Sequence, residues 1–155
     1  MRLRRITTLL AGLALAVTGS LLSAGQANAY DYYVGNGDIA TCPSGDFCIS
    51  ANDWGFGTIY GWFGTDRDWY RNDGGNAGPN NKDRSWYNNG TSGLSVVVFK
   101  YGNGGSGNPS TPTVCLRRGY YADFNSTGAG GGLNQGSAHV WSSSCQGAPA
   151  IGHSF

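Results

Sequence analysis

The stretch CPSGDFCISANDWGFGTIYGWF, residues 42–63, decides the fold. Cys42 and Cys48 enclose Pro-Ser-Gly-Asp, in which proline fixes φ and glycine tolerates a positive φ, so the chain can turn back far enough for the two sulfur atoms to meet. Ile49 then opens a strand, and the β-prone residues 58–60 follow a turn rich in Asn, Asp and Gly. The stretch therefore predicts a strand, a glycine-rich turn and a second strand.

Residues 1–29 have the layout of a secretory signal peptide. Arginines stand near the start, an apolar run over residues 9–22 follows, and Ala27-Asn28-Ala29 matches the small-x-small pattern of a signal-peptidase site. A membrane anchor is the alternative, but glycine and polar residues interrupt the apolar run. We expect a secreted, extracellular protein with no membrane segment once the leader is removed.

Removal of this leader leaves seven basic and nine acidic residues, a net charge of −2. This charge argues against nucleic acid or an anionic membrane as the partner, because both require a clustered basic surface. Every acidic residue is an aspartate, which suits turns and caps, whereas glutamate favours helices. The composition predicts a turn-rich all-β protein.

The four cysteines are Cys42, Cys48, Cys115 and Cys145. An even number in an exported chain indicates two disulfides rather than metal ligation. Of the three pairings that four cysteines allow, we favour Cys42–Cys48 with Cys115–Cys145, because the first pair is close in sequence and each half then has its own bond. The chain has no Cys-x-x-Cys pair and its histidines lack ligand spacing, so we expect no metal and no cofactor.

Residues 66–81 are polar and rich in glycine, which is typical of a long surface connection. Asp66, Asp68 and Asp73 lie in this segment, but they lack the spaced ligands and the terminal glutamate of an EF-hand. We therefore interpret them as solvated turn residues.

The second half of the chain again alternates strands with glycine-rich loops. Residues 94–99 form the most β-prone run, a loop over 101–112 follows, and residues 113–116 return as a strand. Residues 139–141 are expected to form a closing strand before a disordered tail over 146–155.

The two halves are related by an internal repeat. Ser85 and Ser137 are 52 residues apart, as are Gly55 and Gly107. A repeat of this length built from strands indicates an all-β sandwich of two Greek-key motifs, since neither motif can bury its apolar face alone. The expected divisions are the leader (1–29), an N-terminal extension (30–40), one domain (41–145) and a C-terminal tail (146–155).

Four motifs carry a resemblance to a known family. They are Cys42-Pro43-Ser44-Gly45-x-x-Cys48, Gly57 nine residues later, Ser85-Trp86-Tyr87-Asn88-Asn89 and Val114-Cys115-Leu116. Over residues 41–145 the chain resembles the secreted peptidase inhibitors of filamentous soil bacteria, the metalloproteinase-inhibitor family with a βγ-crystallin-like fold. The resemblance implies two Greek keys and, from the founding type, a secreted thermolysin-like metalloprotease as the partner. We expect the inhibitor to be a monomer.

The resemblance also implies a contact site, because the family offers a bond beside a half-cystine to a protease that prefers a bulky apolar residue after the cut. Cys48-Ile49 and Cys115-Leu116 are the pairs of this kind. Cys115 and Leu116 follow a loop whose prolines would hold it extended, so we take them as the expected protease contact. An ordinary buried strand is the alternative interpretation.

The βγ-crystallin-like fold often binds calcium through two consecutive Asn or Asp residues, two free positions, a Ser or Thr and then a Ser. The nearest matches in this chain are residues 81–86 and 134–138. Both depart from the pattern, since Lys82 replaces an acid or amide, Trp86 replaces the last serine, and the second copy is short of ligands. We expect no high-affinity calcium site.

The chain has no His-Glu-x-x-His, Gly-x-Ser-x-Gly or Walker motif. A Ser-His-Asp trio drawn from so many serines is expected by chance. Paired aspartates could catalyse glycoside hydrolysis, but the catalytic acid needs a raised pKa and therefore a buried position. The aspartates lie in polar loops, where we do not expect them to be buried. We therefore expect that the protein is not an enzyme.

The stronger alternative is a carbohydrate-binding, cell-wall-active or antimicrobial module. Aromatic rings among Asn and Asp residues can stack on the faces of sugars, and the candidate rings are Trp54, Trp62, Trp69 and Tyr70. At least half of the aromatic residues are expected to fill a core that is poor in Leu and Ile. A polysaccharide is thus the second expected partner.

Overall fold

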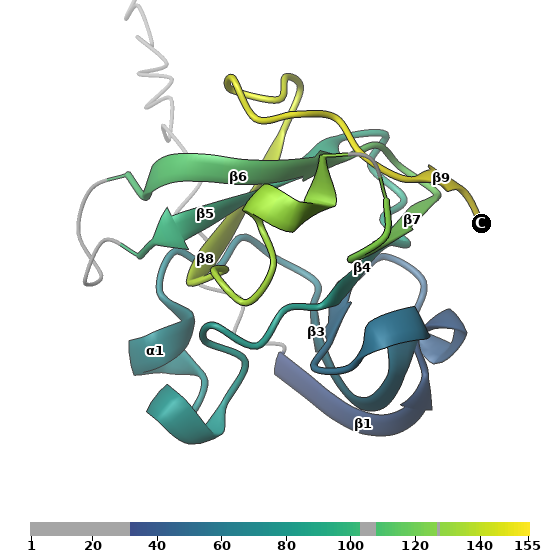
Figure 1. Cartoon of the computed structure of the whole chain (residues 1–155), viewed down its shortest axis with the longest axis vertical. Helices are drawn as coiled ribbons and strands as arrows, with labels where there is room; N and C mark the ends of the chain where they lie inside the picture. Colours follow the sequence, from purple (N-terminus) through teal and green to yellow (C-terminus); the bar gives the residue numbers. More distant parts are fainter. Residues whose placement is uncertain (1–31, 103–107, 127) are drawn as a thin grey trace, which may run out of the picture.

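Two antiparallel β-sheets pack against each other in the computed structural model, which describes residues 32–102, 108–126 and 128–155 (Figure 1). The larger sheet contains, in order across it, β1 (Tyr32–Asp38), β3 (Phe56–Trp62), β2 (Phe47–Ser50), β4 (Ser85–Asn88), β7 (Tyr120–Asp123) and β9 (His153–Ser154). The smaller sheet contains β6 (Ser110–Leu116), β5 (Ser95–Tyr101) and β8 (Ala138–Ser142). The all-β prediction is confirmed, whereas the division into two Greek keys stays a prediction. The expected signal peptide lies outside the described residues.

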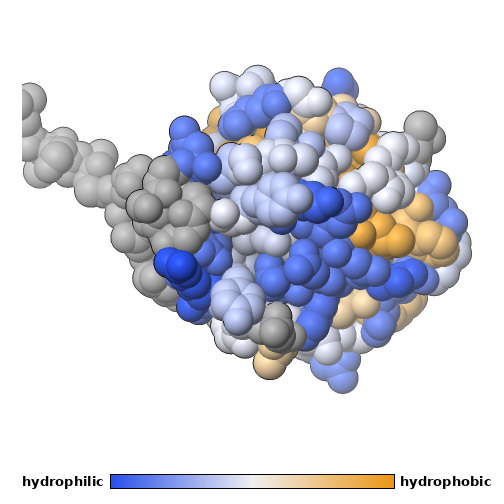
Figure 2. All heavy atoms as spheres, turned by 60° about the vertical axis from the view of Figure 1, so that its left-hand side comes forward, coloured by the Kyte–Doolittle hydropathy of each residue, from blue (hydrophilic) through white to orange (hydrophobic). Residues whose placement is uncertain are grey.

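The remaining elements of the described residues are short. They are one helical turn, α1 (Trp69–Asn72), and four 3-10 turns, η1 (Ile39–Thr41), η2 (Asp53–Gly55), η3 (Gly75–Ala77) and η4 (Ala129–Gly131). Among the described residues, no helix has the length and the hydropathy that a membrane span requires. Polar residues dominate the surface on the side of the molecule where α1 lies, with an apolar patch at one edge (Figure 2).

The hairpin predicted from residues 42–63 is present as β2 and β3, with Ile49 opposite Tyr60. Gly57 has a φ of +92°, and a Cβ at this position would lie 2.0 Å from the side-chain nitrogen of Asn52. The turn between the strands therefore needs glycine for both its backbone conformation and its space. β4 then pairs with the other edge of β2, where Trp86 lies opposite Ile49.

The main core lies between the two sheets and is rich in aromatic side chains. Its large buried members are Phe47, Ile49, Tyr60, Trp62, Trp69, Trp86, Val96, Val98, Val114, Leu116 and Ile151. The alternate residues of β5, Val97 and Phe99, pack with Cys115 and Ala138 in a second cluster. Because β5 is buried on both faces, its sequence is a continuous apolar run rather than an alternating one.

Both ends of the domain contribute strands to the larger sheet. The N-terminal extension contributes β1, which pairs with β3 along its full length from Tyr32 opposite Trp62 to Asp38 opposite Phe56. The prediction of a disordered tail is wrong, because the backbone N–H of Ile151 donates to the carbonyl of Cys115 at 3.0 Å and β9 pairs with β7.

The loop expected over residues 101–112 is shorter than predicted. β5 continues to Tyr101, and β6 already begins at Ser110, before the prolyl residue Pro112. Pro112 is accommodated opposite Phe99, next to a shift in the strand register, and Thr111 has a positive φ of 62°. A proline fits a strand at such an irregularity because its missing N–H removes no regular ladder bond there. Residues 103–107 lie outside the described part of the chain.

Candidate ligand-binding surface

Both expected disulfides are present, Cys42–Cys48 and Cys115–Cys145. The first closes a short loop in which the N–H of Gly45 donates to the carbonyl of Asn89, and the side-chain amide of Asn89 donates to the carbonyl of Cys42, both at 2.9 Å. Two of the motifs that carry the family resemblance are therefore in direct contact. Pro43 and Ser44 are exposed at the tip of this fixed turn.

The structure does not support the expected protease contact at Cys115 and Leu116. Both side chains are fully buried in β6, and Leu116 lies opposite Val96 in the paired strand β5. β5 pairs with one edge of β6, and residues 149–151 bond to the backbone of Cys115 on the other edge, so the bond is covered from both sides. The alternative interpretation, an ordinary buried strand, describes the residues as they lie.

The two calcium-like stretches meet inside the molecule. The N–H of Asn81 donates to the carbonyl of Gly136 at 2.7 Å, and the N–H of Gly136 donates to Oδ1 of Asp83 at the same distance. The indole of Trp86 donates to Oδ2 of Asp83 at 3.0 Å. Burial raises the pKa of Asp83 to about 7, against the lowering effect of these donors. The carboxyl group of Asp83 therefore accepts hydrogen bonds from N–H groups inside the fold.

The interpretation of Asp66, Asp68 and Asp73 as solvated residues is wrong, because all three are buried. The indole of Trp62 donates to Oδ2 of Asp73 at 2.8 Å. Burial, a hydrogen bond with Asp66 and the charge of Asp66 together raise the pKa of Asp73 to about 8. The assumption that the loops offer no buried setting for an acid was thus mistaken, although the absence of catalysis stays a prediction.

His139 lies in the same buried cluster of polar and aromatic side chains. Trp69 Nε1 donates to its Nδ1 at 3.0 Å, so Nε2 carries the proton and donates to the carbonyl of Gly64 at 2.8 Å. Burial lowers the pKa of His139 to about 4, against the raising effect of the Asp66 charge. Trp62 stacks on Trp69 at 4.9 Å, and every ring nitrogen named here has a partner inside the protein. These bonds and stacks hold the buried side chains of the cluster in place.

Of the four rings proposed as sugar platforms, two are buried and two are exposed. Trp62 and Trp69 are 2% and 0% exposed, whereas Trp54 and Tyr70 are 62% and 51% exposed. The expectation that half of these rings fill the core is confirmed for this set. Trp54 and Tyr70 remain available to a ligand.

Trp54 is held at the tip of the turn between β2 and β3. Its backbone has a φ of +63° and a ψ of 14°, a left-handed conformation that is unfavourable for residues with a Cβ atom. Its indole makes an edge-to-face contact with the Phe124 ring at 6.3 Å. The guanidinium of Arg84 lies over Phe124 at 5.7 Å and donates to the Asp53 carboxylate, which fixes the other side of the pair. Sequence reasoning missed Phe124 and Arg84, because nothing local marks their contact with Trp54.

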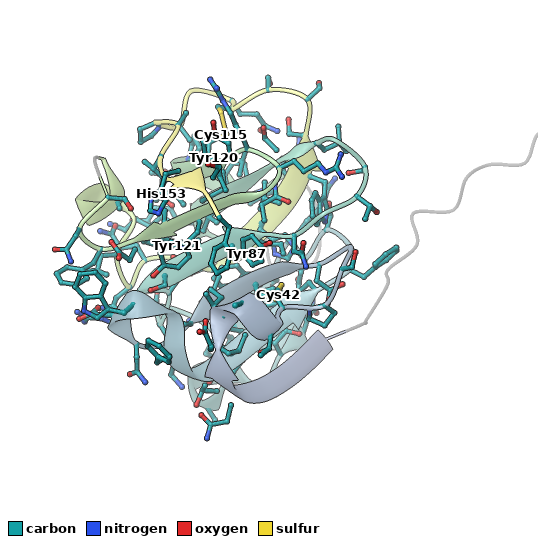
Figure 3. The ribbon with its side chains drawn as sticks, turned by 90° about the vertical axis from the view of Figure 1, so that its right-hand side faces the viewer. Cys42, Tyr87, Cys115, Tyr120, Tyr121 and His153 are labelled. Atoms are coloured by element: carbon teal, nitrogen blue, oxygen red, sulfur yellow. A yellow bond between two sulfur atoms is a disulfide. The ribbon has the colours of Figure 1, made fainter. Side chains whose placement is uncertain are left out.

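A second group of rings covers the outer face of β4, β7 and β9. Tyr121 contacts the rings of His153 and Phe155 at 5.7 and 5.6 Å, and Phe155 stacks on Tyr87 at 4.6 Å. Figure 3 shows Tyr87, Tyr121 and His153 on one face of the molecule, between Cys42 and Cys115. This face also continues toward the Trp54 turn, since a Cβ on Gly55 would lie 3.4 Å from the Tyr121 ring.

A pocket of about 420 Å³ opens beside these rings. Its lining consists of Asp123, Asn125, Ser126, Ala150, Ile151, Gly152 and His153. The two walls come from the turn after β7 and from the C-terminal segment, which are far apart in the sequence. The pocket could not be predicted from the sequence because one wall was expected to be a disordered tail.

Comparisons with models of protein families, with curated proteins and with solved structures each found no significant match. The candidate function is therefore argued from the geometry of the surface alone.

Proposed function

We propose that the protein is a secreted, non-catalytic module that binds neutral polysaccharide through the exposed ring of Trp54. The two disulfides fit an extracellular protein. Aromatic rings offer flat apolar faces to sugars, and the polar groups beside Trp54 can bond to sugar hydroxyls.

The backbone of Trp54 is the observation that carries this proposal. A left-handed conformation costs a residue with a Cβ about 1–2 kcal/mol, and glycine would avoid this cost. Because 62% of the Trp54 side chain is exposed, burial in the core offers little compensation. Strain of this kind is concentrated at binding and catalytic sites, where the side chain is needed for function.

The proposal is tested with Trp54→Gly, because glycine fits the backbone at this position. Retention of the purified protein on chitin and on peptidoglycan is measured together with the free energy of unfolding. We expect at least tenfold weaker binding, the loss typical of a central aromatic contact, and a free energy of unfolding equal to that of the wild type or higher by up to about 2 kcal/mol, because glycine relieves the backbone strain.

Tyr101→Ala is the matched control, because Tyr101 is also exposed but lies at the end of β5 in the smaller sheet. This variant should bind as the wild type does. Wild-type protein that is not retained on either polymer, or equal retention of Trp54→Gly, would refute polysaccharide binding through Trp54.

We propose inhibition of a secreted metalloprotease as the second candidate function. The contact between the Cys42–Cys48 turn and Asn89 favours it, because binding by a fixed turn loses little conformational entropy. Ser44→Arg should weaken inhibition of a thermolysin-like protease at least tenfold, whereas Thr91→Arg, in another exposed loop, should not. The absence of inhibition by the wild type would remove this candidate.

A further inference from the structure

We infer that the pocket between residues 123–126 and 150–153 is a second sugar subsite, which holds the unit next to the one stacked on Trp54. This inference rests on the proposed polysaccharide binding. It adds a site that makes the affinity depend on the length of the oligosaccharide. The volume of about 420 Å³ is near the lower end of the range for ligand pockets, about 300–1,000 Å³, and suits a single pyranose ring.

The chemistry of the lining suits an uncharged sugar. Asp123 presents a carboxylate, and Ser126 Oγ accepts the N–H of Asp123 at 3.0 Å, which leaves the hydroxyl hydrogen able to donate. Asn125 and His153 add exposed polar side chains, while Ile151 supplies an apolar contact. Hydrogen-bonding walls beside an apolar surface match the hydroxyl groups and the C–H faces of a pyranose. The Asp123 carboxylate disfavours an acidic sugar by charge repulsion.

Both walls are fixed before a ligand arrives. In the first wall, the N–H of Asn125 donates to Oδ1 of Asp123 and the N–H of Ser126 donates to its carbonyl, both at 2.9 Å. In the second wall, Gly152 has a φ of +88°, and a Cβ there would lie 2.3 Å from the carbonyl oxygen of Tyr121. A pocket with such fixed walls loses little conformational entropy on binding.

Phe124 connects the pocket and the Trp54 platform along the chain. Phe124 lies in the sequence between the lining residues Asp123 and Asn125, and its ring contacts Trp54 at 6.3 Å. One oligosaccharide can therefore contact the platform and the pocket together. Linking two subsites in this way makes the second contact intramolecular and increases the affinity for longer chains.

The test is a calorimetric titration with N-acetylglucosamine and its β-1,4-linked dimer and trimer. For the wild type we expect the dimer to bind at least tenfold more tightly than the monosaccharide. Ala150→Arg places a long side chain at an exposed lining position of the second wall and should abolish this gain, while the dependence on Trp54 remains. Thr91→Arg is the control for the added charge and should keep the gain.

Asn125→Ala provides a second variant that does not depend on steric blocking, because the Asn125 side chain is exposed and its backbone N–H bond is retained. It should reduce the gain at least threefold. Binding that requires Trp54 but shows the same length dependence in Ala150→Arg and Asn125→Ala would overturn the subsite alone. Failure of the wild type to bind any of the three sugars would overturn both the subsite and the proposed function.

Discussion

At the scale of single residues, three buried ionisable side chains make the stability depend on pH. An unfolded aspartate loses its proton near pH 4, whereas Asp73 and Asp83 in the folded protein keep theirs up to about pH 8 and 7. These carboxyls therefore stabilise the fold at low pH, and this contribution is lost as the pH rises. His139 acts in the opposite direction, because its folded-state pKa of about 4 lies below the value of 6.5 for an exposed histidine.

Between pH 5 and 6 the contributions of Asp73, Asp83 and His139 to the pH dependence of the stability can be added. Of these three groups, Asp73 and Asp83 are protonated in the folded state at this pH, whereas His139 alone is protonated in the unfolded state. The folded state thus holds one net additional proton, so its stability should fall by about 1.4 kcal/mol for each unit of pH increase.

Asp73→Asn tests the largest part of this effect. The asparagine can still accept the Trp62 hydrogen bond but never ionises, so the variant should gain stability relative to the wild type as the pH is raised from about 5 to about 8. Urea denaturation at both pH values measures the difference. Asp38→Asn is the control, because Asp38 accepts the Ala40 N–H in a turn and asparagine can do the same. An unchanged pH dependence in Asp73→Asn would contradict the assignment.

At the scale of elements, the C-terminal segment completes the sheet and one wall of the pocket. Its composition is typical of a loop, but Ile151 is buried in the main core and the N–H of Cys115 donates to the carbonyl of Pro149 at 3.0 Å. The segment has few apolar residues, so its order depends on the buried side chains of Ile151 and Ala148, on backbone bonds to β6 and on the short strand β9.

Ile151→Ala should therefore lower the free energy of unfolding by about 2–5 kcal/mol, through lost burial and the cavity left behind. Val34→Ala is the control, since the Val34 side chain is 54% exposed and its truncation should change the stability by less than about 0.5 kcal/mol. Chemical denaturation of both variants gives the comparison. Equal effects would mean that the C-terminal segment contributes no packing energy.

At the scale of the whole molecule, the two disulfides constrain the unfolded chain to different extents. The bonds join residues separated by 6 and 30 positions, and the chain-entropy model assigns about 2 and 4 kcal/mol to loops of these sizes. Together they are comparable to the whole stability of a small domain.

The paired variants Cys42→Ala/Cys48→Ala and Cys115→Ala/Cys145→Ala separate these contributions. We expect both to lower the Tm, the second pair by more, because it closes the longer loop. The second pair should also weaken oligosaccharide binding, since the Cys115–Cys145 bond anchors the chain that leads into the C-terminal wall of the pocket. A larger loss of stability in the first pair would contradict the loop-length argument.

Sequence alone determined the features that are set by neighbouring residues. The hairpin of β2 and β3, the strand β5 and the pairing Cys42–Cys48 depend on turn residues, β-prone runs and short separations. Local preferences of this kind act within a few residues, so they can be recognised without knowing the rest of the fold. The pairing Cys115–Cys145 followed from the same reasoning, because once Cys42 and Cys48 are paired the two remaining cysteines can pair only with each other.

Only the tertiary structure decided which polar and aromatic side chains are buried. Trp62 and Trp54 look alike in the sequence, but Trp62 bonds to Asp73 in the core while Trp54 is exposed beside Phe124. Trp69 finds its partner 70 residues away, at His139. A polar group can be buried only where distant segments bring it a hydrogen-bond partner, and the pocket likewise exists only where two distant segments meet.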